Sequence, residues 1–102
     1  MARISTHVLD IARGRPAAGI AVELYFGGKL VGSSRTNADG RTDAPLLAGE
    51  KIALGAYELL FHAGQTLFFS DITIRFNVTN ATDNYHVPLL LAPYGYSTYR
   101  GS

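Results

Sequence analysis

The 102-residue sequence contains no cysteine, which excludes disulfide bonds and thiolate chemistry and suits a reducing compartment such as the cytoplasm. It has no run of basic residues, and its net charge of +1 gives no reason to expect nucleic acid or an anionic membrane as a partner. No segment approaches the roughly 20 apolar residues of a membrane span. The opening MARISTHVLD has no apolar stretch typical of a secretory signal, so we expect a cytoplasmic protein with one domain over residues 1–102.

Alternation of apolar and polar residues is the dominant pattern. It occurs in IAVELYF (20–26), SDITIRFNV (70–78) and YHVPLLL (85–91), and turn residues such as Gly27-Gly28 and Asp39-Gly40 separate such runs. Many short strands without a helical period favour an antiparallel β-sandwich. The pattern predicts about eight strands, near residues 3–10, 20–26, 29–36, 41–44, 52–61, 67–77, 84–91 and 94–100.

Pro88 lies inside one of the predicted strands, in YHVPLLL. Proline has no backbone N–H to donate to a neighbouring strand. We therefore expect a free edge or a bulge at this position.

Few side chains can perform chemistry, and no histidine pair has the spacing of a metal site. Taken alone, His7 is expected to be a hydrogen-bonded strand residue, and His62 to be an exposed turn residue. His86 lies opposite the apolar face of its strand, so it must face water, a partner or a cavity. Arg41 follows a turn, where it is either solvated or holds an acidic or carbonyl-rich ligand.

Four motifs together resemble those of the 5-hydroxyisourate hydrolases, the enzymes related to transthyretin. They are STHVLD (5–10), TNADGRTDAPLL (36–47), YHVPLLLAP (85–93) and YSTYRGS (96–102), and they cover nearly the whole chain in order. The resemblance implies a transthyretin-like sandwich of two four-stranded antiparallel sheets. It also implies a homotetramer, a dimer of dimers with a central channel and active sites at the dimer–dimer interface.

Matched motif by motif, the resemblance assigns catalysis to His7, Arg41, His86 and Ser102, and substrate binding or the channel wall to Tyr99 and Ile11. The implied reaction is hydrolysis of 5-hydroxyisourate to 2-oxo-4-hydroxy-4-carboxy-5-ureidoimidazoline in urate catabolism, with neither a metal nor an organic cofactor. One histidine would activate water while Arg41 stabilises the oxyanion. The sequence leaves open which histidine is the base.

Two other functions are compatible with such a fold: a non-catalytic carrier of planar aromatic ligands in the same channel, and a structural or adhesive sandwich. The carriers lack the terminal YRGS and the histidine–arginine set that this chain has, which favours the hydrolase. In the family a longer insert with a short helix usually separates the strands that correspond to YELLF and DITIRF. Only HAGQTLFFS (62–70) lies between them here, so we expect the helix to be absent or reduced to a turn.

Overall fold

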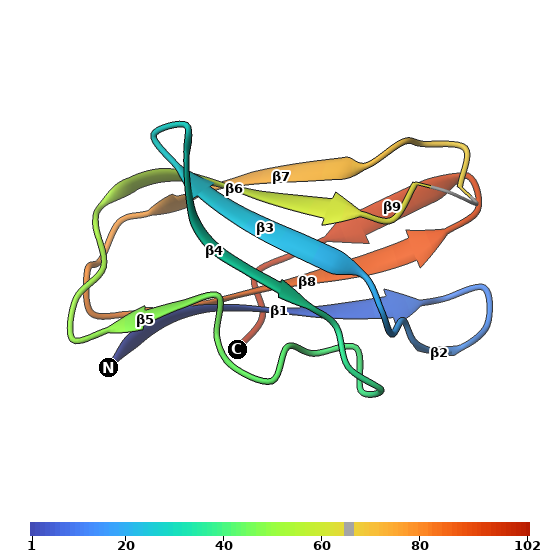
Figure 1. Cartoon of the computed structure of the whole chain (residues 1–102), viewed down its shortest axis with the longest axis horizontal. Helices are drawn as coiled ribbons and strands as arrows, with labels where there is room; N and C mark the ends of the chain where they lie inside the picture. The colour runs from blue at the N-terminus through green and yellow to red at the C-terminus, as the bar shows by residue number, and fades with distance from the viewer. Residues whose placement is uncertain (65–66) are drawn as a thin grey trace.

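The computed structural model describes residues 1–64 and 67–102, and its strands form two stacked sheets (Figure 1). Sheet A has the order β2-β1-β8-β9, with β5 also paired to β1; its strands are β1 (Ala2–Asp10), β2 (Arg15–Pro16), β5 (Leu47–Gly49), β8 (Asn84–Ala92) and β9 (Gly95–Thr98). Sheet B has the order β4-β3-β6-β7; its strands are β3 (Ala21–Phe26), β4 (Lys29–Arg35), β6 (Gly55–His62) and β7 (Ile72–Val78). The predicted all-β sandwich is confirmed.

The observed sheets differ in two details from the expected two four-stranded antiparallel sheets. Strands β1 and β8 run parallel, from the pair Arg3–Asn84 to the pair Asp10–Leu91. Sheet A has five strands because the short β2 and β5 join it. Alternation within a strand reveals its faces but not the direction of a neighbour far away in the sequence.

The strand expected over residues 41–44 is also absent. These residues form a loop with one isolated bridge between Arg41 and His7, and the strand of this region is β5. The Thr42 hydroxyl donates to the Ala44 carbonyl at 2.6 Å, and Pro45 has no N–H to give. A local side-chain hydrogen bond and a proline are thus found where the pattern predicted a strand paired by backbone hydrogen bonds.

The core lies between the sheets and is made by the apolar faces of the alternating strands. Val22 and Leu24 of β3 and Leu59 of β6 are fully buried from sheet B, and Val8 and Leu89 are fully buried from sheet A. Burying each such side chain stabilises the fold by about 1.5–3 kcal/mol. The other side of sheet A, its outer face, has the polar residues Ser5, His7 and His86 and also the half-buried Leu9 and Leu90.

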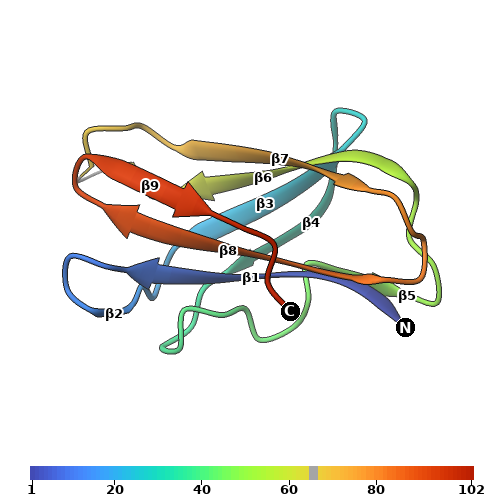
Figure 2. The same ribbon diagram turned by 180° about the vertical axis from the view of Figure 1, so that it is seen from behind.

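The ladder between β8 and the end of the chain is interrupted at Pro88, as expected. Leu89 pairs with Thr98 and His86 bridges to Gly101 in the same register. Pro88, which pairs with His7 on the other side, has no partner on this side. The Thr98 hydroxyl instead donates to the Pro88 carbonyl at 2.7 Å. Beyond this gap the last residues cross the outer face of sheet A in front of β8 and β1 (Figure 2).

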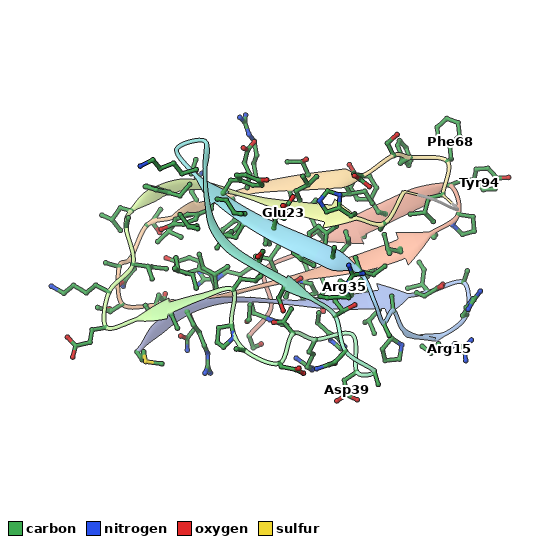
Figure 3. All side chains as sticks on the ribbon, in the orientation of Figure 1. Arg15, Glu23, Arg35, Asp39, Phe68 and Tyr94 are labelled. Atoms are coloured by element: carbon green, nitrogen blue, oxygen red, sulfur yellow. The ribbon has the colours of Figure 1, made fainter. Side chains whose placement is uncertain are left out.

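The short segment between β6 and β7 has no helix in its described residues, 63–64 and 67–71, and positions 65 and 66 lie outside the described residues. The Phe68 N–H donates to the Pro93 carbonyl at 2.8 Å. Phe68 and Tyr94 therefore lie together at one end of the molecule (Figure 3), with ring centroids 6.4 Å apart. Within the described residues there is no helix with the length and apolar character needed to span a bilayer.

Candidate active site

Arg41 is presented by a tight turn that begins at Asn37. The Asn37 Oδ1 accepts hydrogen bonds from the N–H of Asp39 at 2.9 Å and of Arg41 at 3.2 Å. Gly40 has a φ of 75°, and a Cβ there would lie 2.3 Å from the Val8 carbonyl oxygen. Only glycine fits this position, because a side chain would be strained and would also collide with β1.

His7 fastens this turn to β1. Its Nε2 lies 2.8 Å from the carbonyl oxygen of Asp39 at the tip of the turn (Figure 3), and its backbone bridges to Arg41. A carbonyl oxygen can only accept, so Nε2 of His7 carries the proton. The His7 ring and backbone therefore both fix the position of Arg41 relative to sheet A.

His86 projects from β8 onto the same outer face. Its Nδ1 lies 2.9 Å from the hydroxyl of Ser5, the residue directly opposite on β1. Burial lowers the pKa of His86 below its ordinary value, and the positive charge of Arg41 lowers the pKa further. His86 is thus a mainly neutral imidazole at neutral pH.

Arg41, His86 and Ser102 line one shared cavity of about 340 Å³. The other lining residues are Arg3, Ser5, Thr6, Thr42, Asp43, Ala44, Pro45 and Asn84. Among the described residues, the Arg41 guanidinium has neither a side-chain hydrogen bond nor an ion pair, so its donors can bind a ligand. A neutral imidazole, a guanidinium and a hydroxyl around one cavity can hold a carbonyl-rich molecule and accept a proton from water.

The three other residues singled out from the sequence, His7, Tyr99 and Ile11, do not line this cavity. Ile11 and Tyr99 are 55% and 56% exposed, and Tyr99 borders a separate cavity of about 200 Å³ beside β7. Their roles at a pocket or channel wall stay predictions. A larger cavity of about 690 Å³ lies against the β1–β2 turn, and no histidine is among its lining residues.

His62 is exposed, as expected, but it is the last residue of β6 and not part of a turn. Its ring lies between Glu23 of β3 and Asp71, at 2.8 Å from each carboxylate. The hydrogen bond to Glu23, followed by that to Asp71, raises the pKa of His62, and the His62 hydrogen bond lowers the pKa of Glu23. None of these three residues lines the cavity. In the described parts of the chain there is no group of three acidic, histidine or cysteine side chains that could hold a metal ion.

Ser5 is the cavity residue that the sequence analysis missed. Its contact with His86 depends on the parallel register of β1 and β8, which joins residues 81 positions apart. No local pattern encodes that register, so the sequence carried no direct signal for this contact. The serine of STHVLD was visible only as part of a motif.

The fold and the cavity together define a two-sheet β-sandwich with a histidine, an arginine and a serine at one outer face. The family model described as the HIUase/Transthyretin family matches residues 4–101, and the chain belongs to this family. It is 48% identical over 118 residues to the 5-hydroxyisourate hydrolase 2 of Rhizobium meliloti (strain 1021), with 98% of this chain and 96% of that protein covered. That alignment is longer than the 102 residues of this chain, so the relative has residues without a counterpart here.

Two solved structures have the same fold. The 5-hydroxyisourate hydrolase of Klebsiella pneumoniae is 38% identical, with a TM-score of 0.89 and all of both chains covered. Sea bream transthyretin, solved in complex with thyroxine, is 22% identical, with a TM-score of 0.81 and with 97% of this chain and 94% of that chain covered. The expectation of a transthyretin-like sandwich is therefore confirmed.

Proposed function

We propose that this protein is a 5-hydroxyisourate hydrolase that acts in urate catabolism. The observation that carries the proposal is the convergence of Arg41, His86 and Ser102 on one cavity. The name of the Rhizobium relative, which matches nearly the full length of this chain, supports the choice of substrate. The product would be 2-oxo-4-hydroxy-4-carboxy-5-ureidoimidazoline.

In the proposed reaction, His86 is the general base. Its lowered pKa keeps the ring neutral at neutral pH, so Nε2 can take a proton from water as the water oxygen attacks the ring amide carbonyl. Arg41 stabilises the negative charge that develops on the carbonyl oxygen. The C–N bond then breaks and the proton passes from His86 to the leaving nitrogen. The carboxylic acid that is formed releases the second proton of the water to the solvent and becomes a carboxylate.

We assign His7 and Ser102 to supporting roles. The Nε2–H of His7 is already committed to the Asp39 carbonyl, so His7 is better suited to holding the Arg41 turn than to activating water. The Ser102 hydroxyl, which lines the cavity, would orient the attacking water or the substrate. Tyr99 and Ile11 would contribute to the pocket and channel walls only in an assembly.

We further propose a homotetramer, a dimer of dimers in which this outer face of sheet A meets a second copy. Leu9 and Leu90 face each other on that side of the sheet and are only half-buried in the single chain. A second copy over the cavity would exclude water from it, and exclusion of water strengthens the interactions of Arg41 with the substrate. The cytoplasmic location expected from the sequence stays a prediction, which fractionation of the native host would test.

The alternative is a carrier that binds planar aromatic ligands without reacting with them. The fold likeness to transthyretin is compatible with it, but at 22% identity that likeness concerns the fold alone. Binding alone does not require a neutral histidine, His86, beside the guanidinium of Arg41, which has no side-chain partner among the described residues. The residues around the cavity therefore favour the hydrolase.

The test is the absorbance decay of 5-hydroxyisourate that has been freshly generated from urate by urate oxidase. We expect the wild-type protein to accelerate the decay, and His86→Ala to reduce kcat by about 100- to 10,000-fold, the usual contribution of a general base. His62→Gln is the matched control, because His62 lies outside the cavity lining. Gel filtration checks that all variants have the same size.

Wild-type protein that leaves the spontaneous decay unchanged would refute the hydrolase. Binding of thyroxine or a similar planar aromatic compound by the same sample would then favour the carrier. Equal losses in His86→Ala and His62→Gln would show that the assay reports folding and not the site.

A further inference from the structure

Ser5 and His86 form a pair that the proposed mechanism has not used. They lie directly opposite each other in the parallel β1–β8 ladder, and the Ser5 Oγ is 2.9 Å from Nδ1 of His86. Among the described residues, His86 is the only side-chain hydrogen-bond partner of the Ser5 hydroxyl. Ser5 itself lines the cavity, so its own proton can be donated to water or to a ligand there.

The hydrogen bond at Nδ1 decides what His86 can do at its other nitrogen. A neutral imidazole carries one proton, and the partner of one nitrogen sets which nitrogen has it. When Nδ1–H donates to the Ser5 hydroxyl, Nε2 has a free lone pair and can accept a proton. When the hydroxyl donates to Nδ1, Nε2 carries the proton and cannot act as a base.

We propose that Ser5 is a positioning residue for this hydrolysis: its hydroxyl accepts the Nδ1–H of His86 and so keeps Nε2 unprotonated for the attacking water. The inference rests on the proposed function, in which His86 is the base. Gly101 leaves room for the His86 ring at this place, because a Cβ at that position would lie 2.5 Å from Cδ2 of His86. A flip of the ring would place a carbon against Ser5 and lose the hydrogen bond.

Ser5 also assists while His86 gains its proton. The positive charge of Arg41 opposes formation of the imidazolium. The Ser5 oxygen offsets part of this repulsion, because its hydrogen bond becomes charge-assisted as the ring becomes cationic. The stabilisation grows toward the transition state, so its loss lowers kcat more than it changes KM.

The experiment compares Ser5→Thr with Ser5→Val in the urate oxidase-coupled assay. The two side chains have the same shape and both suit a strand, but only threonine keeps the hydroxyl. We expect Ser5→Val to lose about 10- to 100-fold in kcat with little change in KM, as partners of functional histidines typically do, and Ser5→Thr to retain most of the activity. Ser97→Ala is the control, because Ser97 is outside the cavity lining and has no side-chain hydrogen bond among the described residues.

Two further measurements separate positioning from a merely structural role. Nitrogen NMR of the ¹⁵N-labelled histidines should show the Nδ1–H form of neutral His86 in the wild type and in Ser5→Thr, and its loss in Ser5→Val. The acid limb of the kcat profile should move to lower pH in Ser5→Val, because the imidazolium loses an acceptor, and should be restored in Ser5→Thr.

An Nε2–H form in the wild type would overturn the inference, and so would equal kcat values for Ser5→Thr and Ser5→Val. Wild-type protein without hydrolase activity would refute the proposed function instead, and the NMR result would then still report whether Ser5 sets the protonation of His86.

Discussion

Gly101 touches the ring of His86 so closely that the substitution Gly101→Ala should displace it. The added Cβ would lie 2.5 Å from Cδ2 and 3.3 Å from Cγ of the ring. Carbon atoms settle at about 3.5–4.0 Å, so the ring and residue 101 must separate by about 1 Å. The backbone cannot retreat freely, because the Gly101 N–H donates to the His86 carbonyl at 2.8 Å.

A shift of about 1 Å in a catalytic group costs about 100-fold in rate, and we expect Gly101→Ala to lose about that factor in kcat. The free energy of unfolding should fall by no more than about 1.5 kcal/mol, the contribution of one hydrogen bond, since residue 101 is outside the core. The 5-hydroxyisourate decay assay gives the rate, and chemical unfolding gives the stability. Gly95→Ala in β9 is the matched control, because a Cβ there has no atom within 4 Å.

Wild-type activity in Gly101→Ala would refute the reasoning, and a crystal structure of the variant with an unmoved His86 ring would refute it directly. A comparable loss in Gly95→Ala would show that the terminal hairpin tolerates no alanine, independent of His86.

Three further predictions follow from other contacts. Arg41→Lys keeps the charge but loses the planar, two-pronged donor, and kcat/KM in the decay assay should fall at least about 10-fold. Glu23 raises the pKa of His62, so the pair adds stability that is present below the ordinary His62 pKa of 6.5 and is lost as the pH rises through the raised value. The free energies of unfolding of wild type and His62→Gln, measured in urea, should therefore become more alike as the pH rises over that range. Leu59→Ala removes a fully buried side chain and should lower the free energy of unfolding by about 2–5 kcal/mol in the same urea experiment.

Each of these predictions has a control and a contradicting result. Arg75→Lys, on the far sheet, should be fully active, and an equal loss there would disprove a specific role for Arg41. A constant stability difference between wild type and His62→Gln from pH 5 to 9 would mean that the pKa of His62 is not raised by folding. Leu54→Ala, at a side chain that is 58% exposed, should change stability by less than about 0.5 kcal/mol.

The sequence predicted well which side chains of the long strands face the core, because burial of one side of a strand makes apolar and polar residues alternate. Val22 and Leu24 are buried as expected, and His86 points away from the core, as its position opposite Val87 predicted. Strands as short as β2 and β5 show no such period, and the pattern missed both. The two-residue β2 and the three-residue β5 are strands because they form backbone hydrogen bonds with β1, and their own residues carry no pattern of alternation.

The candidate site was predictable to the extent that motifs carry it. Arg41 follows a turn that only glycine at position 40 permits, and that turn was visible as Asp39-Gly40. The partners of the two histidines were not visible, because they depend on strand register and on a loop folding back to β1. Ser5 beside His86 and the Asp39 carbonyl beside His7 are long-range contacts, which no local pattern encodes.

The parallel pairing of β1 with β8 also sets the order of events during synthesis. His86 follows Ser5 by 81 positions, and this whole stretch must leave the ribosome before the two strands can meet. Until then the apolar side chains of Ile4 and Val8 in β1 lack the neighbours that bury them in the folded protein. Closing so long a loop is slow because it costs conformational entropy. A growing chain therefore passes through a stage in which sheet B can form while β1 has only the short strands β2 and β5 as partners and lacks β8. We expect β1 to be aggregation-prone at this stage, and chaperone dependence of folding should be traced to β1.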